Sequence, residues 1–598
     1  MNIPIKTNQL KIDMNTSMIN EKYEIFKIET TEKYFKNGAY ILDAPLLCNN
    51  VCSVYFNSGR CFYVLMIKDT ANKSRLKEVL LFKTEDGDKI TIAQMDIAAV
   101  EQRIIISLLL NALGSYELDF LRFNNLTGHL YCFHPKWLKK RARKNESKIL
   151  KIPCLEISIT NDLRLTIDVR TFTSELLKKQ IVFKKKKFEQ YPKYTLAANN
   201  TLRRKLSTDT NECFILRQTQ GDKTVIPFMD IQNLEKFESS KMGILTYVKN
   251  RFNEKYKELC TFEFQPIDEY ISAESSQALI KENKRTVQNL QKEHTIKIVD
   301  YIGDEFSARF CTEIQMLLKE KYDIDAVIGN RITKNSLNIC VIHNALYYDG
   351  NSDPYKKVHE GTAVQHITLE DFMGNANAAI TTVVHELLIK NDIEHKHISL
   401  FDWNSAGINE EIDFGMRTII NEEERYFFMK IKTDGSFDFE EQKLDLFSIN
   451  DYTDCMQIFT DSNDVAGVIR YANGDINIIK ETSWFTIPEI EKIYKELSVG
   501  NTYLRGREMR YELLSSITDI KLFGKEEYKY YFAGVIGEGM QTKINNAANI
   551  RKIEPYKNSA LRFDELLPLM NVTFVRNGQL TVLPFPFKYL KEYIKSVI

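Results

Sequence analysis

The sequence has no long apolar run, little glycine or proline, and no paired-cysteine motif. Its 598 residues include 24 glycines, 13 prolines and 10 cysteines. No stretch reaches the roughly 18 apolar residues of a membrane-spanning helix. The first residues, Met1 to Lys6, lack the basic and apolar blocks of a secretory signal. Since no CxxC pair occurs, we expect reduced, mostly buried thiols in a cytoplasmic protein with no membrane partner.

An excess of charge of one sign is also missing. Lys+Arg and Asp+Glu both number 81, so the formal net charge is zero. This excludes a protein coated in positive charge but allows a local basic channel. Walker A, GxSxG and HExxH motifs do not occur, which argues against a P-loop NTPase, an α/β-hydrolase and a zincin.

The length predicts about three to five domains, and the patterns predict a multidomain α/β protein. Short apolar runs predict a mixed β/α lobe over 1–170, with strands that include 51–56, 61–67 and 79–83, a helix over 93–113 and a hairpin around 160–162. Residues 171–290 are expected to form a basic, helical linker. Strand and helix patterns alternate over 291–395, which predicts a Rossmann-like unit. Residues 396–598 should form a mixed sheet, with Asx-Gly hairpins at 434–435, 473–474 and 577–578 and a helix at 540–551.

Positive charge is concentrated in the first half of the chain, over 136–151, 184–187 and 203–205. One lysine run is usually a solvated surface, but three within 70 residues of a neutral protein favour binding to a phosphate backbone. The residues expected to contact the backbone of a nucleic acid are Lys139, Lys140, Arg141, Arg143, Lys184, Lys185, Lys186 and Lys187.

A second candidate site lies between residues 354 and 390. Tyr355, Lys356 and Lys357 precede Gln365 on a predicted strand, and Lys390 ends a predicted helix. A terminal phosphate needs several converging donors and an aromatic ring to stack the first base. These five residues could supply that set, although on chemistry alone a Rossmann-like loop with solvated lysines is the plainer interpretation.

One acidic residue stands in an otherwise apolar segment. Asp402 lies within a predicted strand, 397–403. It is either a cap at the end of the strand or the first metal ligand of an RNase H-type sheet, in which several carboxylates hold two Mg²⁺ ions.

The order of these residues resembles the MID domain of Argonaute proteins, with its Tyr/Lys pair, its strand Gln and a helix-ending Lys. Gln365 and Lys390 are 25 residues apart, as in that family. The segment Leu583 to Lys591 is similar to the terminal P-x-P-x-x-Y-x-[HD] motif of PIWI domains. The resemblance implies a MID-like domain over 291–395 and a PIWI-like RNase H fold over 396–598, with PAZ absent or reduced.

The departures from the family pattern bear on catalysis. Lys591 stands where the family has a metal ligand, and Asn473 where it has a catalytic Asp. With Asp402 these positions are vestigial. The resemblance therefore implies an inactive protein that binds a 5′-phosphorylated guide and a complementary target in bacterial defence against plasmid or phage DNA. Its partners would be guide DNA or RNA, target, and a separate effector nuclease or helicase. Mg²⁺ is expected only at the guide 5′ phosphate.

Two alternatives stay open from the sequence. The first is an active Mg²⁺-dependent nuclease that uses Asp402, Asp434 or Asp464, and Glu481 in a rearranged site. The second is a scaffold subunit of a defence complex that binds no guide.

Overall fold

The computed structural model describes residues 5–35, 40–83, 89–114, 121–138, 149–180, 191–216, 226–267, 269, 271–272, 289, 295–334, 336–344, 347–348, 353–356, 361–420, 423–443, 450–500, 521–532, 543–572, 574–575 and 583–597. None of the helices in these ranges is long and apolar enough to cross a membrane. All ten cysteines are free thiols, and all but Cys48 and Cys52 are buried.

The first lobe is an antiparallel sheet in the order β3-β4-β2-β5. Its elements are β2 (Tyr23–Thr30), β3 (Val51–Ser58), β4 (Cys61–Ile67), the helix α3 (Asn72–Lys83) and β5 (Ile90–Met95). The strands predicted at 51–56 and 61–67 are confirmed. The strand predicted at 79–83 is wrong, because this segment ends α3. Leu76 and Leu80, one helical turn apart, are both buried in the core of the lobe.

A second sheet has the order β11-β10-β12-β9-β8-β7-β6. Its strands are β6 (Arg122–Leu126), β7 (His129–Phe133), β8 (Lys151–Ile159), β9 (Leu165–Ser174), β10 (Tyr194–Leu196), β11 (Leu202–Arg204) and β12 (Phe214–Leu216). The hairpin predicted around 160–162 joins β8 to β9 and is confirmed. β9 runs across the boundary expected at residue 170. The helix predicted over 93–113 is shorter, α4 (Gln102–Asn111), because 93–95 complete β5.

The segment from 229 is helical at first and then extended. α5 (Leu234–Glu238) and α6 (Lys241–Lys255) confirm the predicted helices, but β14 (Cys260–Ile267) is a strand. Phe262 and Phe264 are buried on either side of exposed Glu263, so the side chains alternate with the period of a strand. Most of the remaining linker, from residue 268 to residue 294, falls outside the described residues.

The Rossmann-like unit is confirmed. Its parallel sheet has the order β17-β16-β18-β19. The elements are β16 (Ile296–Asp300), α8 (Glu305–Tyr322), β17 (Val327–Gly329), β18 (Leu337–Ile342), β19 (Val364–Thr368), α9 (Leu369–Phe372) and α10 (Ala376–His395). Asp304 begins α8 by accepting a hydrogen bond from the backbone N of Ser307.

The C-terminal region is a larger mixed α/β unit, so the multidomain α/β class is confirmed. Its sheet follows the order β15-β25-β26-β28-β24-β23-β20-β21-β22. β23 pairs antiparallel with β20. The main elements are β20 (Ile412–Ile420), β21 (Glu423–Ile431), β22 (Phe437–Gln442), α11 (Thr453–Asp461), β23 (Val465–Tyr471), β24 (Ile476–Ile487), α12 (Ile490–Ser498), β25 (Lys521–Gly524), β26 (Lys529–Phe532), β28 (Asn549–Pro555), α14 (Phe563–Met570) and α15 (Pro586–Val597).

Two of the three Asx-Gly hairpins are confirmed, one between β21 and β22 and one between β23 and β24. The third, at 577–578, lies outside the described residues. The helix predicted over 540–551 is wrong, because β28 occupies its second half and pairs with β24. The alanines and asparagines before Ile550 suit a helix, but pairing within the sheet overrides that local preference.

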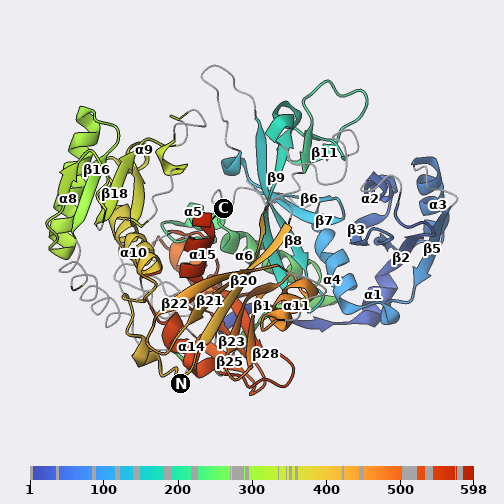
Figure 1. The fold of residues 1–598 in the computed structure, drawn as a ribbon. Helices are drawn as coiled ribbons and strands as arrows, with labels where there is room; N and C mark the ends of the chain where they lie inside the picture. Colours follow the sequence, from blue (N-terminus) through green and yellow to red (C-terminus); the bar gives the residue numbers. More distant parts are fainter. Residues whose placement is uncertain are drawn as a thin grey trace.

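The two smaller lobes lie at opposite ends of the molecule (Figure 1). The lobe of β2–β5 is at one end and the parallel sheet with α8 is at the other. The C-terminal sheet lies between them, and α15 is near the centre, beside α10. Residues that are distant in sequence therefore meet around α15.

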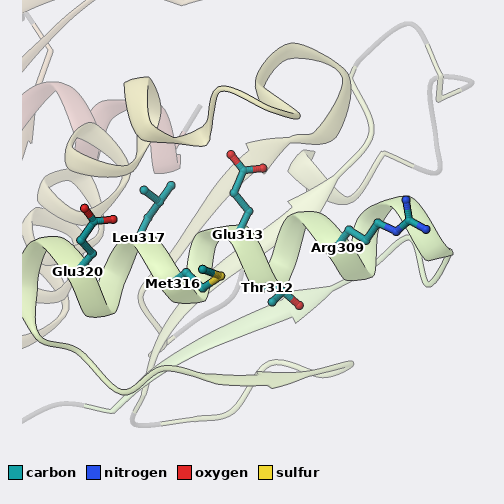
Figure 2. Close-up of a pocket in the computed structure, with 6 residues that line it drawn as sticks. All are labelled: Arg309, Thr312, Glu313, Met316, Leu317 and Glu320. Atoms are coloured by element: carbon teal, nitrogen blue, oxygen red, sulfur yellow. The ribbon is translucent and has the colours of Figure 1, made fainter.

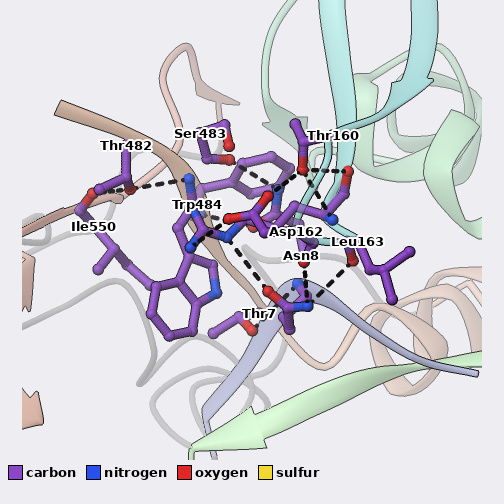
Figure 3. Close-up of polar contacts among 12 residues, drawn as sticks. Thr7, Asn8, Thr160, Asp162, Leu163, Thr482, Ser483, Trp484 and Ile550 are labelled. Carbon is purple, nitrogen blue, oxygen red and sulfur yellow. Dashed lines mark hydrogen bonds and ion pairs between the residues drawn. The ribbon is translucent and has the colours of Figure 1, made fainter. Parts of the chain in front are cut away.

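The N-terminal strand β1 (Ile5–Met14) ties three regions together. It pairs with β14 and with the end of β24. The buried Asn8 side chain donates to the carbonyls of Leu165 (3.0 Å) and Ser483 (2.9 Å) and accepts from the backbone N of Phe485 (2.9 Å). Figure 3 shows this junction, with Asn8 between the β8–β9 turn and β24.

We expect Asn8→Ala to destabilise this junction strongly. It leaves the buried Leu165 carbonyl and the buried Phe485 N–H without this partner, at about 1–3 kcal/mol each, and also removes the partly buried bond to the Ser483 carbonyl. Thermal unfolding should show a clearly lower midpoint. Gln9→Ala is the matched control on the same strand, since Gln9 bonds the more exposed turn at Asp162. Equal midpoints for both variants would contradict this role of Asn8.

Candidate nucleic-acid interface

Gln365 and Lys390 meet where α10 packs against β19. The Lys390 ammonium donates to the Gln365 side-chain oxygen (2.6 Å) and to the Val364 carbonyl (2.8 Å). α10 follows β19 and packs back along it, so its last turns lie beside the start of the strand. The structure thus brings together two residues that the sequence places 25 positions apart. Burial lowers the pKa of Lys390.

A chain of hydrogen bonds continues from Gln365 to the C-terminal helix. The Gln365 amide nitrogen donates to Glu386 of α10 (2.7 Å), and Lys588 of α15 donates to the same carboxylate (3.0 Å). Lys588 also donates to Glu592 (2.8 Å), which in turn accepts from Lys595 (2.7 Å). These hydrogen bonds therefore join the Rossmann-like unit to the C-terminal helix α15, and lysines alternate with glutamates along them.

Packing fixes α15 in this position. Its buried face carries Phe587, Leu590 and Ile594. A Cβ at Gly467 of β23 would lie 2.5 Å from the Phe587 ring, so the helix sits close to the sheet because that residue is glycine. Tyr589 donates to Asp392 of α10 (2.6 Å), which anchors α15 to the Rossmann-like unit.

The face of α15 next to this buried face is basic. Lys588, Lys591 and Lys595 are spaced three and four residues apart and so share one side of the helix. Lys591 is exposed and has no hydrogen bond or ion pair within the described residues. Partial burial lowers its pKa, and the neighbouring charges of Arg551, Lys588 and Lys595 act in the same direction, against Glu481. Such a crowded cation is suited to an incoming anion.

We call these nine residues the interdomain cluster. It consists of Gln365, Glu386, Lys390, Glu481, Arg551, Lys588, Lys591, Glu592 and Lys595. The sequence predicted Gln365 and Lys390 as ligands of a terminal phosphate. It singled out Lys591 and Glu481 only in connection with a nuclease site. The helical spacing of the three lysines on α15 was the signal that could have revealed the rest of the basic face.

Tyr355 stands apart from these bonds. It lies on a 3-10 turn, Pro354–Lys356, is 65% exposed, and its ring centroid is 5.3 Å from that of His366 on β19. The Lys356 side chain and Lys357 lie outside the described residues, as do Lys139, Lys140, Arg141, Arg143 and Lys184–Lys187. Their expected phosphate contacts stay predictions.

The three vestigial positions have different local structural roles. Asp402 is not on a strand: its side chain accepts from the backbone N of Asn404 (3.2 Å) and begins a 3-10 turn, Trp403–Ala406. Asn473 lies in the β23–β24 turn and bonds Asp475 (2.9 Å). Lys591 belongs to the basic face of α15. The predicted strand 397–403 is thus wrong, because Asp402 forms a cap with the Asn and Ser that follow.

A different acid occupies an interior strand of this sheet. Asp413 of β20 is buried and bonds Arg470 of β23 (2.9 Å). Burial raises the pKa of Asp413, and Arg470 opposes that shift. The sequence analysis missed Asp413 because it looked for the first acid of the sheet on a strand over 397–403. The strand that carries Asp413, β20, begins only at Ile412.

The acids of the rearranged-nuclease alternative are also dispersed. Asp434 caps the β21–β22 turn through Ser436 (2.6 Å), and Glu481 faces Arg551 (3.5 Å). Ser462 donates to Asp464. In the part of the chain that the structure describes, no three His, Cys, Asp or Glu side chains gather closely enough to hold a metal ion.

A hollow of about 390 Å³ on the outer face of α8 is a weaker candidate. Its six lining residues all come from this one helix (Figure 2). Glu313 among them accepts a bond from the backbone N of Ala376 (3.3 Å), at the start of α10. Its charge is thus used for structure, and the interdomain cluster remains the principal site.

The fold and site define a multidomain α/β protein with a lysine-rich junction between a Rossmann-like unit and a C-terminal helix. No family model and no curated protein matches the chain.

Among solved structures, the chain is similar to Argonaute and Piwi proteins over nearly its full length. Marinitoga piezophila Argonaute in complex with 5′ OH guide RNA is 11% identical, with 99% of this chain and 98% of that chain covered and a TM-score of 0.38. The same protein with guide RNA and target DNA is 12% identical, with 98% of each chain covered and a TM-score of 0.39. Drosophila Piwi is 10% identical, with 100% of this chain and 97% of that chain covered and a TM-score of 0.39. At these values the likeness concerns the course of the chain and not its residues.

Asp392, which anchors α15, should make stability depend on pH. Burial raises its pKa to about 6 from an ordinary 3.8. Between these values the folded chain holds a proton that the unfolded chain releases, so stability falls as pH rises through this window, by at most about 3 kcal/mol. We expect Asp392→Asn to flatten the change in thermal midpoint between pH 4 and 6.5. An unchanged pH dependence would contradict the assignment.

Proposed function

We propose that this chain is an Argonaute-like protein that holds a guide strand and its complementary target without cutting the target. The guide 5′ end would lie at the interdomain cluster, against Gln365 and Lys390. Base pairing would read the target sequence, while the protein holds backbone phosphates and duplex shape.

The observation that carries this proposal is the contact of Gln365 with Lys390 and its extension to the basic face of α15. A strand end needs donors for its terminal group and cations for the phosphates that follow. Gln365 and Lys390 supply the first, and Lys591 with Arg551 supplies the second. Tyr355, exposed near β19, is proposed to stack on a base.

The absence of cleavage is the second part of the proposal. Two-metal hydrolysis needs several carboxylates around ions about 3.5–4 Å apart. Asp413, buried on the interior strand β20, is instead bonded to Arg470, and Asp402 caps a turn. Both carboxylates thus already have structural partners.

The biological part of the proposal rests on the resemblance of the motifs. The chain would act in defence against plasmid or phage DNA, in the cytoplasm, and pass the signal of target binding to a separate effector nuclease or helicase. A strain that carries the gene should lose an invading plasmid faster than one without it.

Extraction of nucleic acid from the purified protein tests the proposal. We expect short strands of a defined length range, and no Mg²⁺-dependent cutting of a target matched to a loaded guide. A protein free of nucleic acid that also fails to bind added short strands would contradict guide binding. Cutting of the matched target would contradict the second part.

A further inference from the structure

The sheet of the first lobe has one edge that other parts of the chain cover and one that the described residues leave open. On the edge strand β3, the Val54 carbonyl accepts from the Asn111 amide (2.8 Å), and the Phe56 N–H donates to the Gly128 carbonyl (3.2 Å). The opposite edge is β5, which pairs with β2 and with no other strand of the described residues. Figure 1 shows β5 and α3 at the outer end of the lobe, away from the C-terminal sheet. One row of backbone N–H and C=O groups of β5 is therefore available to another strand.

The sequence of β5 does not oppose such pairing. Edge strands are usually protected by charged side chains, proline or a bulge. The six residues of β5, Ile-Thr-Ile-Ala-Gln-Met, include no charge and no proline, and their register with β2 is regular from Ile90 to Met95. An edge of this kind is suited to β-augmentation, in which an extended segment of a partner adds a strand to the sheet.

A groove beside this edge supplies side-chain contacts for an added strand. It has a volume of about 190 Å³ and is lined by Lys73, Lys77, Leu80 and Leu81 of α3 and by Ile90 and Ile92 of β5. Leu81 is 45% exposed, which leaves apolar surface for a ligand. Since successive side chains of a strand point to opposite faces, every second residue of an added strand would face this groove.

The two lysines give the groove its charge. Lys73 and Lys77 are exposed and one helical turn apart, and neither has a hydrogen bond or ion pair within the described residues. Arg75 on the same helix is instead paired with Asp69 (2.7 Å). A segment that fills the groove should therefore carry carboxylates for the lysines and apolar side chains for Leu81 and the two isoleucines.

We propose that β5 and this groove bind an extended segment of a partner protein, with acidic and apolar residues two positions apart on the face that meets α3. The binding does not depend on a guide. A second copy of this chain is a poorer occupant, because antiparallel pairing of two β5 strands would place the lysines of both copies on the same face of one sheet. A nucleic acid would meet only two lysines beside an apolar lining, which suits a phosphate backbone poorly.

The test selects random linear peptides from a display library on the full-length protein. We expect enriched sequences with Asp or Glu two positions from Val, Ile or Leu, and a synthetic peptide of that sequence should slow amide hydrogen exchange within residues 90–95. Lys73→Glu with Lys77→Glu should bind this peptide about tenfold more weakly, because two attractions become repulsions. Lys257→Glu with Lys492→Glu, which reverses two exposed lysines elsewhere, is the matched control and should bind it as wild type does.

Several results would overturn the inference. Selection that enriches no such sequences, or a bound peptide that leaves exchange in β5 unchanged, would show that the edge takes no strand. An equal loss of affinity in the control variant would leave only an effect of net charge. Exchange in β5 that slows with protein concentration alone would assign the edge to a second copy, and displacement of the peptide by a short DNA or RNA strand would assign the groove to nucleic acid. Guide binding should be the same in the Lys73, Lys77 variant and in wild type, so failure here is distinct from failure of the proposed function.

Discussion

Guide binding should fall steeply when Lys390 and Gln365 are both replaced by alanine. Lys390 contributes a partly buried charge at the expected end of the guide, and hydrogen bonds to charged groups contribute about 1.5–3 kcal/mol each. We therefore expect the Kd for a short single strand to rise about 10- to 100-fold. The measurement is equilibrium binding of a labelled strand at fixed salt.

Folding has to be separated from binding in that experiment, because Lys390 also bonds the Val364 carbonyl. The thermal midpoint of the double variant supplies this control. Lys319→Ala is the matched lysine variant, since Lys319 lies on α8 and pairs with Asp323 and Asp325. A double variant that is folded and binds as tightly as Lys319→Ala would contradict the placement of the guide end.

The largest loss of stability should follow the removal of Arg470. Asp413 has a side-chain exposure of only 3%, and Arg470 is the partner that neutralises it. Removing one member of a buried ion pair typically costs about 3–5 kcal/mol, because an uncompensated charge remains. Arg470→Met should therefore lower the thermal midpoint far more than Asp413→Asn, which leaves no buried negative charge.

The stability deficit of Arg470→Met should also depend on pH. Burial raises the pKa of Asp413 even with Arg470 present, and without Arg470 the carboxyl should take up a proton still more readily. The deficit of Arg470→Met should therefore shrink as the pH falls from 7 towards 4. A deficit that is constant with pH would indicate lost packing of the arginine rather than an uncompensated buried charge.

The sequence predicted most where local patterns and tertiary contacts agree. The strand–helix alternation from Ile296 gave the parallel sheet, because buried strands and an amphipathic α8 have distinct periods. The contact of Gln365 with Lys390 followed from a helix that folds back on its strand. Strand β28 could not be predicted in the same way, since its pairing with β24 decides its conformation.

The candidate site was predictable only in part. Glu386 is one helical turn before Lys390, yet nothing in a single sequence indicates that it accepts from Gln365 and from Lys588, 202 residues away. The basic face of α15 could have been predicted from the sequence, because Lys588, Lys591 and Lys595 follow the helical period. Asp402 was misplaced because the apolar residues around it mask its role as a cap.

Guide-dependent capture of a target is the most direct test of the account. The protein is loaded with a short single-stranded guide, and its affinity is measured for a complementary target, for a scrambled target and for the same target without guide. We predict tight binding of the complementary target alone, with the target recovered intact after incubation in Mg²⁺. Equal affinity for all three, or binding that needs no guide, would contradict the central claim.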